Sequence, residues 1–384
     1  MSNSLTNVMD KILARGLMTL REAAIMPRLV NVDYNANEAK QFGDTIDVPK
    51  PAAQVASSVV AGVQGSATPA SKTPGKVQVP MDQWKTTDFH LTDKDMVEVD
   101  RNRHFLPMQT AEAARVLANT ADTYIHGKYT GVYGYVGTAG VVPFSSVATA
   151  TGARVVLNEQ LAPMSERRIV MDPTAEGQAL QLAAYSDVSQ TQDRPVKIEG
   201  EIGRKFGFDH FMSQNVLTHT AGTRASARVA STTAAGASSI DLKAAASAAV
   251  GTIVVGDVFT IAGQAQTYAA QNTVSLVSAL TKVAVSIKPG LSAIASANAV
   301  VQIKRSHVVN LAFNKNAFAF VTRPLADGER VETANAVIRQ LTDDVTGITL
   351  RLELVRQRKQ MAWEFDHLYG GALVRPEFAA RIAG

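Results

Sequence analysis

Residues 107–129 read PMQTAEAARVLANTADTYIHGKY and are the one segment of the chain that argues for a long uninterrupted helix. Pro107 suits a first helical turn, because the N–H group that proline lacks would be unpaired there. Apolar side chains recur at helical spacing at Ala111, Ala114, Leu117, Ala121, Tyr124, Ile125 and Tyr129. Such a helix would span roughly 34 Å at 1.5 Å per residue. The segment predicts a long helix with one apolar face, to which the other segments attach.

The end of this helix and its packing face are also visible in the sequence. Repeated glycine is costly inside a helix, and glycines follow at 127, 131, 134, 137 and 140. Small side chains at Ala111, Ala114, Ala118 and Ala121 would let another element approach closely. An ordinary core helix is the alternative interpretation of this segment alone.

The composition limits the classes of protein to which the chain can belong. With 384 residues, of which 46% are hydrophobic and 19% charged, it can bury a full core and form more than one compact unit. It has no run of eighteen apolar residues, and MSNSLTNVMDK lacks the basic start and apolar centre of a secretory signal. We therefore expect a cytoplasmic product. The absence of cysteine excludes disulfides, thiolate chemistry and cysteine-ligated metals.

The first 44 residues predict an N-terminal arm. Leu5, Val8, Met9, Ile12 and Leu13 fall on one face of a short helix that starts after Ser4 and ends near Gly16. Thr19 and Glu22 form a capping box for a second helix over residues 20–26, which Pro27 limits. Two such short helices cannot make a core themselves. We expect them to pack on another part of this chain or on another chain.

Residues 45–91 predict an extended loop. TIDVPK at 45–50 is typical of a strand, and residues 51–80 are then dominated by Ala, Ser, Val, Gly, Thr and Pro. Alternation resumes at Val77, Val79 and Met81, and DQWKTTDFHL at 82–91 continues as strand. A hairpin with arms of about seventeen residues would reach roughly 50 Å. A flexible linker and an arm that becomes ordered on a neighbouring subunit both remain open. Thr92 and Asp95 offer a capping box at the start of the spine-helix region, 92–130.

The remaining body is mixed. Residues 131–220 predict a helix at 147–161, a buried strand at 167–171, a helix from Asp172 to Ala184 and a strand at 206–216. Residues 307–384 predict one strand through Ile348 and Leu354, a second through Met361 and Phe365, and a short tail. No βαβ repeat supports a doubly wound sheet, so the class is α+β.

Residues 221–306 predict an inserted small β domain. Their composition changes to Ala, Ser, Thr, Val and Gly, with strands expected at 257–261, 266–270, 282–288 and 300–305. The segment has seven Lys and Arg residues against two Asp, a balance of +5 in a chain whose net charge is +4. We favour a solvated barrel surface over a nucleic-acid site, because no aromatic stacking platform accompanies these charges.

A search for catalytic and metal-binding patterns finds none. The chain lacks GxxxxGK[ST], GxSxG, HExxH, GxGxxG and EF-hand motifs. Asp93 with Asp95, and Asp343 with Asp344, are carboxylate pairs for which capping and solubility are the favoured roles over catalysis or metal binding. For Arg356, Arg358 and Lys359 we favour a solvated strand edge over a phosphate site. The histidines show no i, i+4 pair: they are at 90, 104, 126, 210, 219, 307 and 367. We expect no enzyme, and no catalytic, cofactor or metal residues.

The order of these parts resembles the major capsid proteins of tailed bacteriophages, which have the Hong Kong ninety-seven fold. It is most similar to the short-tailed-phage coat proteins that carry an extra insertion domain. Four segments in the same order carry the resemblance: GFDHFMSQNV at 207–216, GDVFTIAG at 256–263, NLAFNKNAFAFVTRPL at 310–325 and DHLYGGALVRPEFAARI from Asp366. The insertion is unusually rich in alanine, and residues 51–80 match no particular contact of the family.

The resemblance implies an N-terminal arm, an extended loop, a spine helix, peripheral and axial domains split by the insertion, and an icosahedral shell around double-stranded DNA. It also implies hexamers and pentamers of the chain, scaffolding and portal proteins as partners, no membrane, no cofactor, and assembly in a bacterial cytoplasm. Two other classes remain open. The pI of about 9.2 favours a nucleic-acid-binding protein, and the Ala-, Ser- and Thr-rich insertion favours a modular adhesin or fibre protein.

Overall fold

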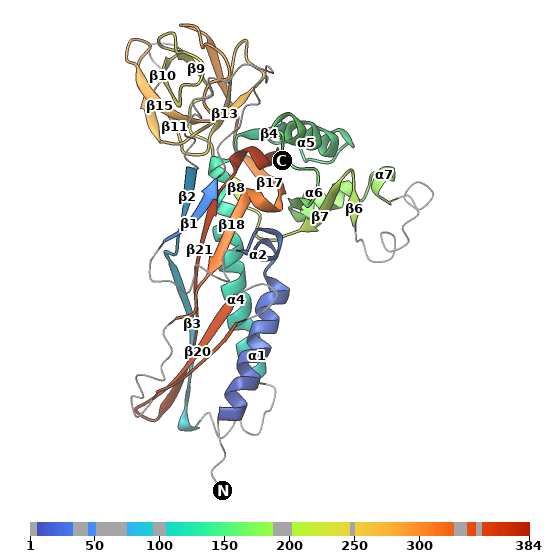
Figure 1. The fold of residues 1–384 in the computed structure, drawn as a ribbon, viewed down its shortest axis with the longest axis vertical. Coiled ribbons are helices and arrows are strands. Elements are labelled where there is room, and N and C mark those ends of the chain that lie inside the picture. The colour runs from blue at the N-terminus through green and yellow to red at the C-terminus, as the bar shows by residue number, and fades with distance from the viewer. Residues whose placement is uncertain are drawn as a thin grey trace, which may run out of the picture.

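The computed structural model describes residues 6–33, 45–50, 75–94, 105–186, 202–245, 250–325, 336–342 and 348–384. The molecule is elongated, with a β-barrel at one end of its long axis and the start of the N-terminal helix α1 towards the other (Figure 1). Helices and two sheets form the body between these ends. The predicted α+β class is confirmed.

The long central helix is α4, Phe105–Gly127, which continues as the 3-10 helix η2, Lys128–Gly131. It matches the predicted segment at 107–129 to within two residues. Its apolar face is buried against the rest of the body: Ala114, Leu117, Ala118 and Ile125 are at most 2% exposed. The small side chains on this face let helix α1 lie alongside (Figure 1).

The N-terminal helix is α1, Thr6–Ala23, and it is followed by the short helix α2, Met26–Leu29. The prediction of two short helices divided at Gly16 is wrong, because α1 runs through this residue. A Cβ at Gly16 would lie 3.4 Å from Leu350 and from Thr110, so glycine allows close approach to the body. Leu13, Leu17 and Leu20 are buried there. That packing offsets the roughly 1 kcal/mol that glycine costs in a helix.

Helices α1 and α4 cover one face of a five-stranded antiparallel sheet. Trp363 and Phe365 face the helices and are buried, while the alternating Glu364 points to the opposite face. Arg358 and Lys359 have positive φ and form the turn between strands Thr349–Gln357 and Gln360–Leu373, which corrects the expectation that they lie along a strand edge. The strands are β18 (Phe318–Thr322), β21 (Gln360–Leu373), β20 (Thr349–Gln357), β19 (Ala336–Thr342) and β3 (Gln83–Thr92), with β3 paired to β21.

The base of the predicted extended loop is a hairpin. Strand β1, Thr45–Lys50, pairs with β2, Gly75–Pro80, from Thr45 opposite Pro80 to Lys50 opposite Gly75. Ile46, Val48 and Val79 are buried against the body of the same chain. Residues 51–74, on which the choice between linker and contact arm depends, lie outside the described residues, as does Asp95 of the predicted capping box.

A second sheet forms the other half of the body, next to the helices α5 (Ala148–Glu159), α6 (Pro173–Ala179) and α7 (Ala183–Ser186). Asp172 caps α6, as predicted, but the helix stops at Ala179 where the sequence has no glycine or proline to mark the break. The predicted strand at 206–216 is shorter, because Phe206 and Gly207 have positive φ and make a turn. The strands run in the order β4 (Gly134–Gly137), β22 (Ala379–Ala383), β17 (His307–Asn314), β5 (Arg167–Met171), β7 (Phe208–Met212) and β6 (Arg204–Lys205).

The C-terminal segment was expected to be a short tail, and this expectation is wrong. Strand β22 lies between β4 and β17, parallel to the first and antiparallel to the second. All five of its residues are buried. Because β22 is buried on both faces of the sheet, its side chains must be apolar or well paired, which the sequence AARIA supplies if Arg381 has partners.

The barrel is closed and antiparallel, and all its strands fall within the predicted insertion. The four predicted strands are present in shortened form, and two strands that were not predicted, β9 and β10, complete the barrel. Phe259 and Tyr268 lie in its core, with ring centroids 5.9 Å apart. The strands are β9 (Ser226–Val229), β10 (Ser239–Ala244), β12 (Val258–Ile261), β13 (Thr267–Ala270), β15 (Val283–Lys288) and β16 (Val300–Ile303), beside a small ribbon of β11 (Gly251–Ile253) and β14 (Val274–Leu276).

Candidate functional sites at the barrel junction and the assembly surfaces

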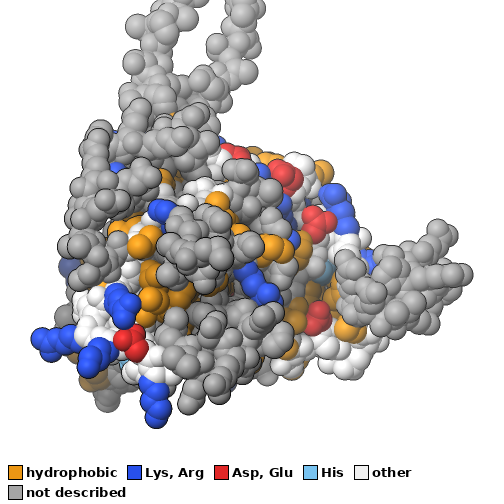
Figure 2. Space-filling view, turned by 90° about the horizontal axis from the view of Figure 1, so that it is seen from below, with side chains coloured by type: hydrophobic (Ala, Val, Ile, Leu, Met, Phe, Trp, Pro, Cys, Tyr) orange, Lys and Arg blue, Asp and Glu red, His pale blue; other side chains and the backbone are white. Residues whose placement is uncertain are grey.

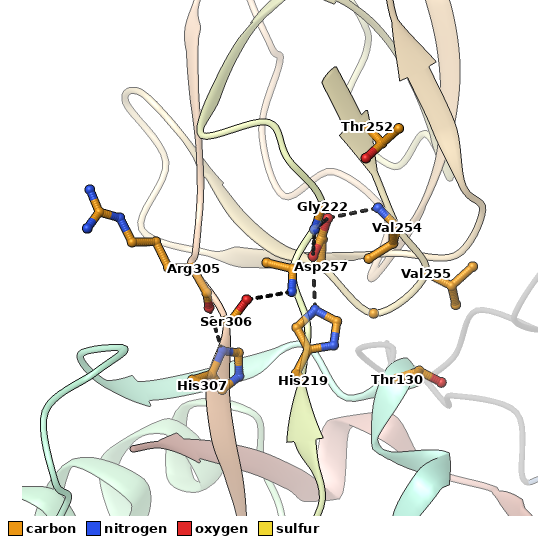
Figure 3. Close-up of polar contacts among 12 residues, drawn as sticks. Thr130, His219, Gly222, Thr252, Val254, Val255, Asp257, Arg305, Ser306 and His307 are labelled. Carbon is orange, nitrogen blue, oxygen red and sulfur yellow. Dashed lines mark hydrogen bonds and ion pairs between the residues drawn. The ribbon is translucent and has the colours of Figure 1, made fainter. Parts of the chain in front are cut away.

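Two adjacent chain segments connect the barrel to the body. They are residues 221–225 and 303–306, called the connectors below. The Ile303 N–H donates to the Ala225 carbonyl at 3.0 Å, and the Ala221 N–H donates to Ser306 Oγ at 2.9 Å (Figure 3). Just inside the body, strand β8, Thr218–His219, pairs with the start of β17, so that His219 faces His307. The chain enters and leaves the barrel at one place.

A buried chain of polar side chains crosses this junction. Asp257 of the barrel accepts a hydrogen bond from His219 Nε2 at 2.9 Å (Figure 3). On its other side, His219 Nδ1 lies 3.1 Å from the Tyr129 hydroxyl. Burial raises the pKa of the Tyr129 phenol, so this hydroxyl keeps its proton and donates to His219. The other Asp257 oxygen accepts from the Val254 N–H at 2.8 Å and from the Gly222 N–H at 3.2 Å. Asp257 therefore connects His219 of the body with the connector at Gly222 and with the barrel backbone at Val254.

Tyrosine, histidine and aspartate linked by hydrogen bonds also occur in catalytic sites, but these three side chains are not accessible to a substrate. Asp257 is 0% exposed, His219 3% and Tyr129 8%, so no substrate reaches the imidazole. The group at the end of the chain is a phenol in the core rather than an open nucleophile. The geometry fixes the position of the barrel against the body.

A buried arginine makes the second link across the junction. Arg381 of β22 donates from Nη1 to the Gly256 carbonyl at 2.7 Å and from Nη2 to the Thr130 carbonyl at 3.1 Å. Its guanidinium carbon lies 5.0 Å from the centre of the Tyr129 ring, within the range of a cation–π contact. Burial lowers the pKa of Arg381 to about 10, so it remains charged at pH 7.

Gly256 and His307 show how closely the two parts meet. Gly256 has φ +92, and a Cβ there would lie 3.1 Å from Thr130 and 3.3 Å from His219. His307 Nδ1 lies 2.7 Å from the Arg305 carbonyl, and its ring packs edge-on against Tyr135 with centroids 5.3 Å apart. Burial, with the nearby Arg381 charge, lowers the pKa of His307 to about 4, so this histidine is neutral at pH 7.

The described part of the N-terminal arm is fastened to the same chain. Asp122 of α4 is 0% exposed and accepts hydrogen bonds from the N–H groups of Met26 at 2.9 Å and Ile25 at 3.0 Å. Burial raises the pKa of Asp122 to about 6, although these bonds and one from Asn215 act in the opposite direction. Arg168 donates to the Leu29 carbonyl. The arm therefore packs on the body of its own chain over residues 12–31. Of the two expected partners, this chain or another chain, the described part of the arm has the first.

Large apolar side chains are exposed at several separate places. Trp84 is 61% exposed on the sheet face opposite α1 and α4, with its Nε1 donating to Asp366 at 3.2 Å. Viewed from the lower end of the molecule, apolar side chains lie next to Lys and Arg side chains (Figure 2). The most exposed of the large apolar side chains on the body and the barrel are Leu161 (86%), Met164 (69%), Met108 (69%), Leu280 (94%), Val250 (71%) and Ile294 (63%).

Most of the acidic residues and histidines considered as candidate site residues in the sequence lie far apart in the structure. Asp93 pairs with Arg356 at 3.3 Å in an exposed position, while Asp343, Asp344 and His104 lie outside the described residues. Only His219 and His307 are brought together at the junction, with centroids 5.5 Å apart. The described residues contain no group of three or more His, Asp or Glu placed to hold a metal. Among the described helices, none is long and apolar enough to cross a bilayer.

Sequence reasoning missed the residues of the junction. Asp257 was counted only as one of two acids in the insertion, and Arg381 was placed in a tail. One signal was available: each is a lone charge within an apolar strand segment, GDVFTI and AARIA, where burial demands a partner.

The chain was compared with known proteins. No family model and no curated protein matches it. Among solved structures it is similar to one from mycobacterium phage Che8, at 15% identity and a TM-score of 0.49, covering 94% of this chain and 90% of that one. The capsid of cyanophage P-SCSP1u gives 12% identity and 0.46 over 94% and 88% of the two chains. A virus-like particle from Pyrococcus furiosus gives 8% and 0.43 over 97% and 98%. These three similar structures come from two phages and a virus-like particle, at identities of 15% or less.

Proposed function

We propose that the chain is a major capsid protein of the tailed-phage type, a subunit that assembles into a closed icosahedral shell around double-stranded DNA. The observation that carries this proposal is the shape of the body. It is elongated, and within the described residues helices α1 and α4 cover one face of its five-stranded sheet, with the β1–β2 hairpin beside the sheet and the barrel at one end (Figure 1). A subunit of this form exposes broad side surfaces to neighbours, as a shell tile must.

The uncovered sheet face supports the same proposal. Trp84 stands 61% exposed on it, and the neighbouring Glu353 and Glu364 lie on the same face of adjacent strands. Glu353 and Glu364 are directly opposite each other, and burial raises the pKa of Glu364, with the nearby carboxylates adding to the effect. Like charges in this position destabilise a free subunit, and Arg351, 3.7 Å from Glu353, offsets only part of the repulsion. A neighbouring copy that covers Trp84 and brings a Lys or Arg side chain to the two carboxylates would bury the indole and balance the charge.

The finer assignment follows the resemblance found in the sequence. In this proposal residues 1–44 are the N-terminal arm, 45–91 the extended loop, and 92–130 the spine-helix region. Residues 131–220 and 307–384 form the peripheral and axial domains of the Hong Kong ninety-seven fold, and 221–306 the inserted domain. The chain would form hexamers and pentamers with scaffolding and portal proteins in the bacterial cytoplasm, and would enclose DNA without reading its sequence. It would catalyse no reaction.

Sedimentation velocity of the purified chain over a wide concentration range tests the proposal. Heterologous contacts that close under symmetry predict a jump from small species to particles of many subunits. The variant Trp84→Ser should move the jump to higher concentration, whereas Arg115→Gln, in an exposed ion pair on α4, should leave it in place. A single small species at all concentrations would refute the assignment.

A further inference from the structure

A shallow pocket of about 400 Å³ lies where the two connectors leave the body. It is bordered by both connectors at once, and its charged lining is entirely basic, with no Asp or Glu. The residues that matter below are Gly222, Thr223, Arg224, Lys304, Arg305 and Ser306.

Three cationic residues line this pocket and differ in exposure. Arg224 is 7% exposed, Lys304 is half-buried with its Nζ 5.4 Å from the centre of the Tyr135 ring, and Arg305 is exposed. Figure 3 shows the Arg305 side chain extending outward from its connector. Within the described ranges, neither Lys304 nor Arg305 forms an ion pair with an acidic side chain.

One acid is hydrogen-bonded to a residue of the pocket lining, and its oxygens already have partners. Asp257 lies behind Gly222 and accepts hydrogen bonds from the Gly222 and Val254 N–H groups and from His219 (Figure 3). It is fully buried and does not line the pocket. The balancing negative charge is therefore best supplied from outside the chain.

The donors around the pocket suit a phosphate group. A guanidinium offers parallel N–H donors that match two oxygens of a phosphate, and an ammonium adds a point charge. Ser306 Oγ accepts from the Ala221 N–H, which leaves its hydroxyl proton free to donate. We propose that this pocket binds a phosphate group, supplied either by free inorganic phosphate or by the backbone of a nucleic acid.

Phosphate binding in this pocket would restrict the motion of the two connectors that join the barrel to the body. A phosphate held by Arg224 of one connector and by Lys304 and Arg305 of the other would tie the two together. Ligand binding to the folded state stabilises whatever it holds. Amide hydrogen exchange at 221–225 and 303–306 should therefore slow when the pocket is filled.

The test is a titration of the full-length chain with inorganic phosphate, followed by calorimetry and by hydrogen exchange at the connectors. The variant Lys304→Gln with Arg305→Gln should weaken binding by about tenfold or more, since each lost charge-assisted contact contributes on that order. The matched control is Arg228→Gln with Lys243→Gln, which removes the same charge from neighbouring positions on β9 and β10, outside the pocket lining. Its binding should stay within twofold of the parent chain.

A second titration with a short oligomer of deoxythymidine identifies the source of the phosphate. Tighter binding than inorganic phosphate, lost in the pocket variant, would point to a nucleic-acid backbone; equal or weaker binding would point to the free ion. Equal losses in the pocket and control variants would show only a diffuse basic surface, and no binding of either probe would also overturn the proposal. The exposed single change Arg305→Glu, with circular dichroism as a folding check, guards against a misfolded double variant. None of these outcomes depends on whether the chain forms shells.

Discussion

The guanidinium of Arg381, on the last strand of the body, donates a 2.7 Å hydrogen bond to the carbonyl of Gly256 in the barrel. The two residues are far apart in sequence, and this bond and a second one to Thr130 hold the barrel against the end of α4 and η2. Both acceptors are backbone carbonyls, so they lose their partner if the guanidinium is removed.

Replacing this arginine should destabilise the whole chain. The variant Arg381→Met keeps much of the side-chain volume but leaves two carbonyls without a donor, so we expect a loss of about 3 kcal/mol in the free energy of unfolding. Urea denaturation measures it. Arg115→Met is the matched control, because Arg115 is exposed and its ion pair with Glu112 contributes at most about 1 kcal/mol. Equal effects of the two changes would show that the junction is not held by Arg381.

Comparing an alanine substitution at Gly256 with one at Gly263 separates the cost of close packing at the junction from the cost of backbone strain. Gly256→Ala should lose about 1–3 kcal/mol for its positive φ and more for contact with Thr130 and His219. Gly263→Ala has a similar φ, +86, with nothing within 4 Å of the added methyl, and should show the backbone part alone. Thermal unfolding of both variants gives the difference. If they unfold alike, barrel and body do not meet as described.

The buried carboxyl of Asp122 predicts a particular dependence of stability on pH. Its folded pKa of about 6 lies above the ordinary value of 3.8, so the folded state binds more protons between these values. The protonated carboxyl makes its whole contribution to the free energy of unfolding below pH 3.8. This contribution, about 3 kcal/mol, is lost as the pH rises through 6.

The variant Asp122→Asn isolates this effect, because the asparagine oxygen can still accept from Ile25 and Met26 but has no proton to lose. The buried His307, whose pKa is lowered to about 4, opposes the trend, since it loses stability as the pH falls. The measured quantity is therefore the difference in unfolding free energy between parent and variant at pH 4 and pH 7. A difference that does not change with pH would contradict the buried, raised carboxyl.

Much of the body could be predicted from local patterns. Helix α4 followed from its apolar spacing, and strands β1, β5, β15 and β20 from alternation or from buried β-branched runs, because these signals depend on the residues of the element itself. The continuity of α1 through Gly16 could not, since it depends on contact with Leu350 and Thr110 from distant parts of the chain. Strand β9, SARV, is too short to give a clear signal, whereas β10, SIDLKA, has an alternating pattern that the sequence analysis did not use.

The junction was the least predictable part. His219, Asp257 and Arg381 come from three segments that no local pattern relates, and the closed barrel with its paired connectors is what brings them together. A sequence shows that a lone charge in an apolar strand needs a partner. It does not show which residue the partner is.

The barrel should be the least stable part of the chain, because its core is small. Phe259 is fully buried against Tyr268, and Phe259→Ala should lose about 3–5 kcal/mol, enough to unfold a marginal domain. Hydrogen exchange should then show rapid exchange across 226–303 while α4 stays protected. Exchange that rises equally in both regions would mean that barrel and body unfold as one unit, and that the insertion does not fold separately.

The central claim is that this chain is a shell subunit, and electron microscopy of the purified protein at high concentration tests it most directly. We predict closed, symmetric particles or the rings of subunits from which they form, since the elongated body and the exposed Trp84 offer contact surfaces to neighbouring copies. Fibres would favour an adhesin, and compact single molecules at every concentration would contradict the account.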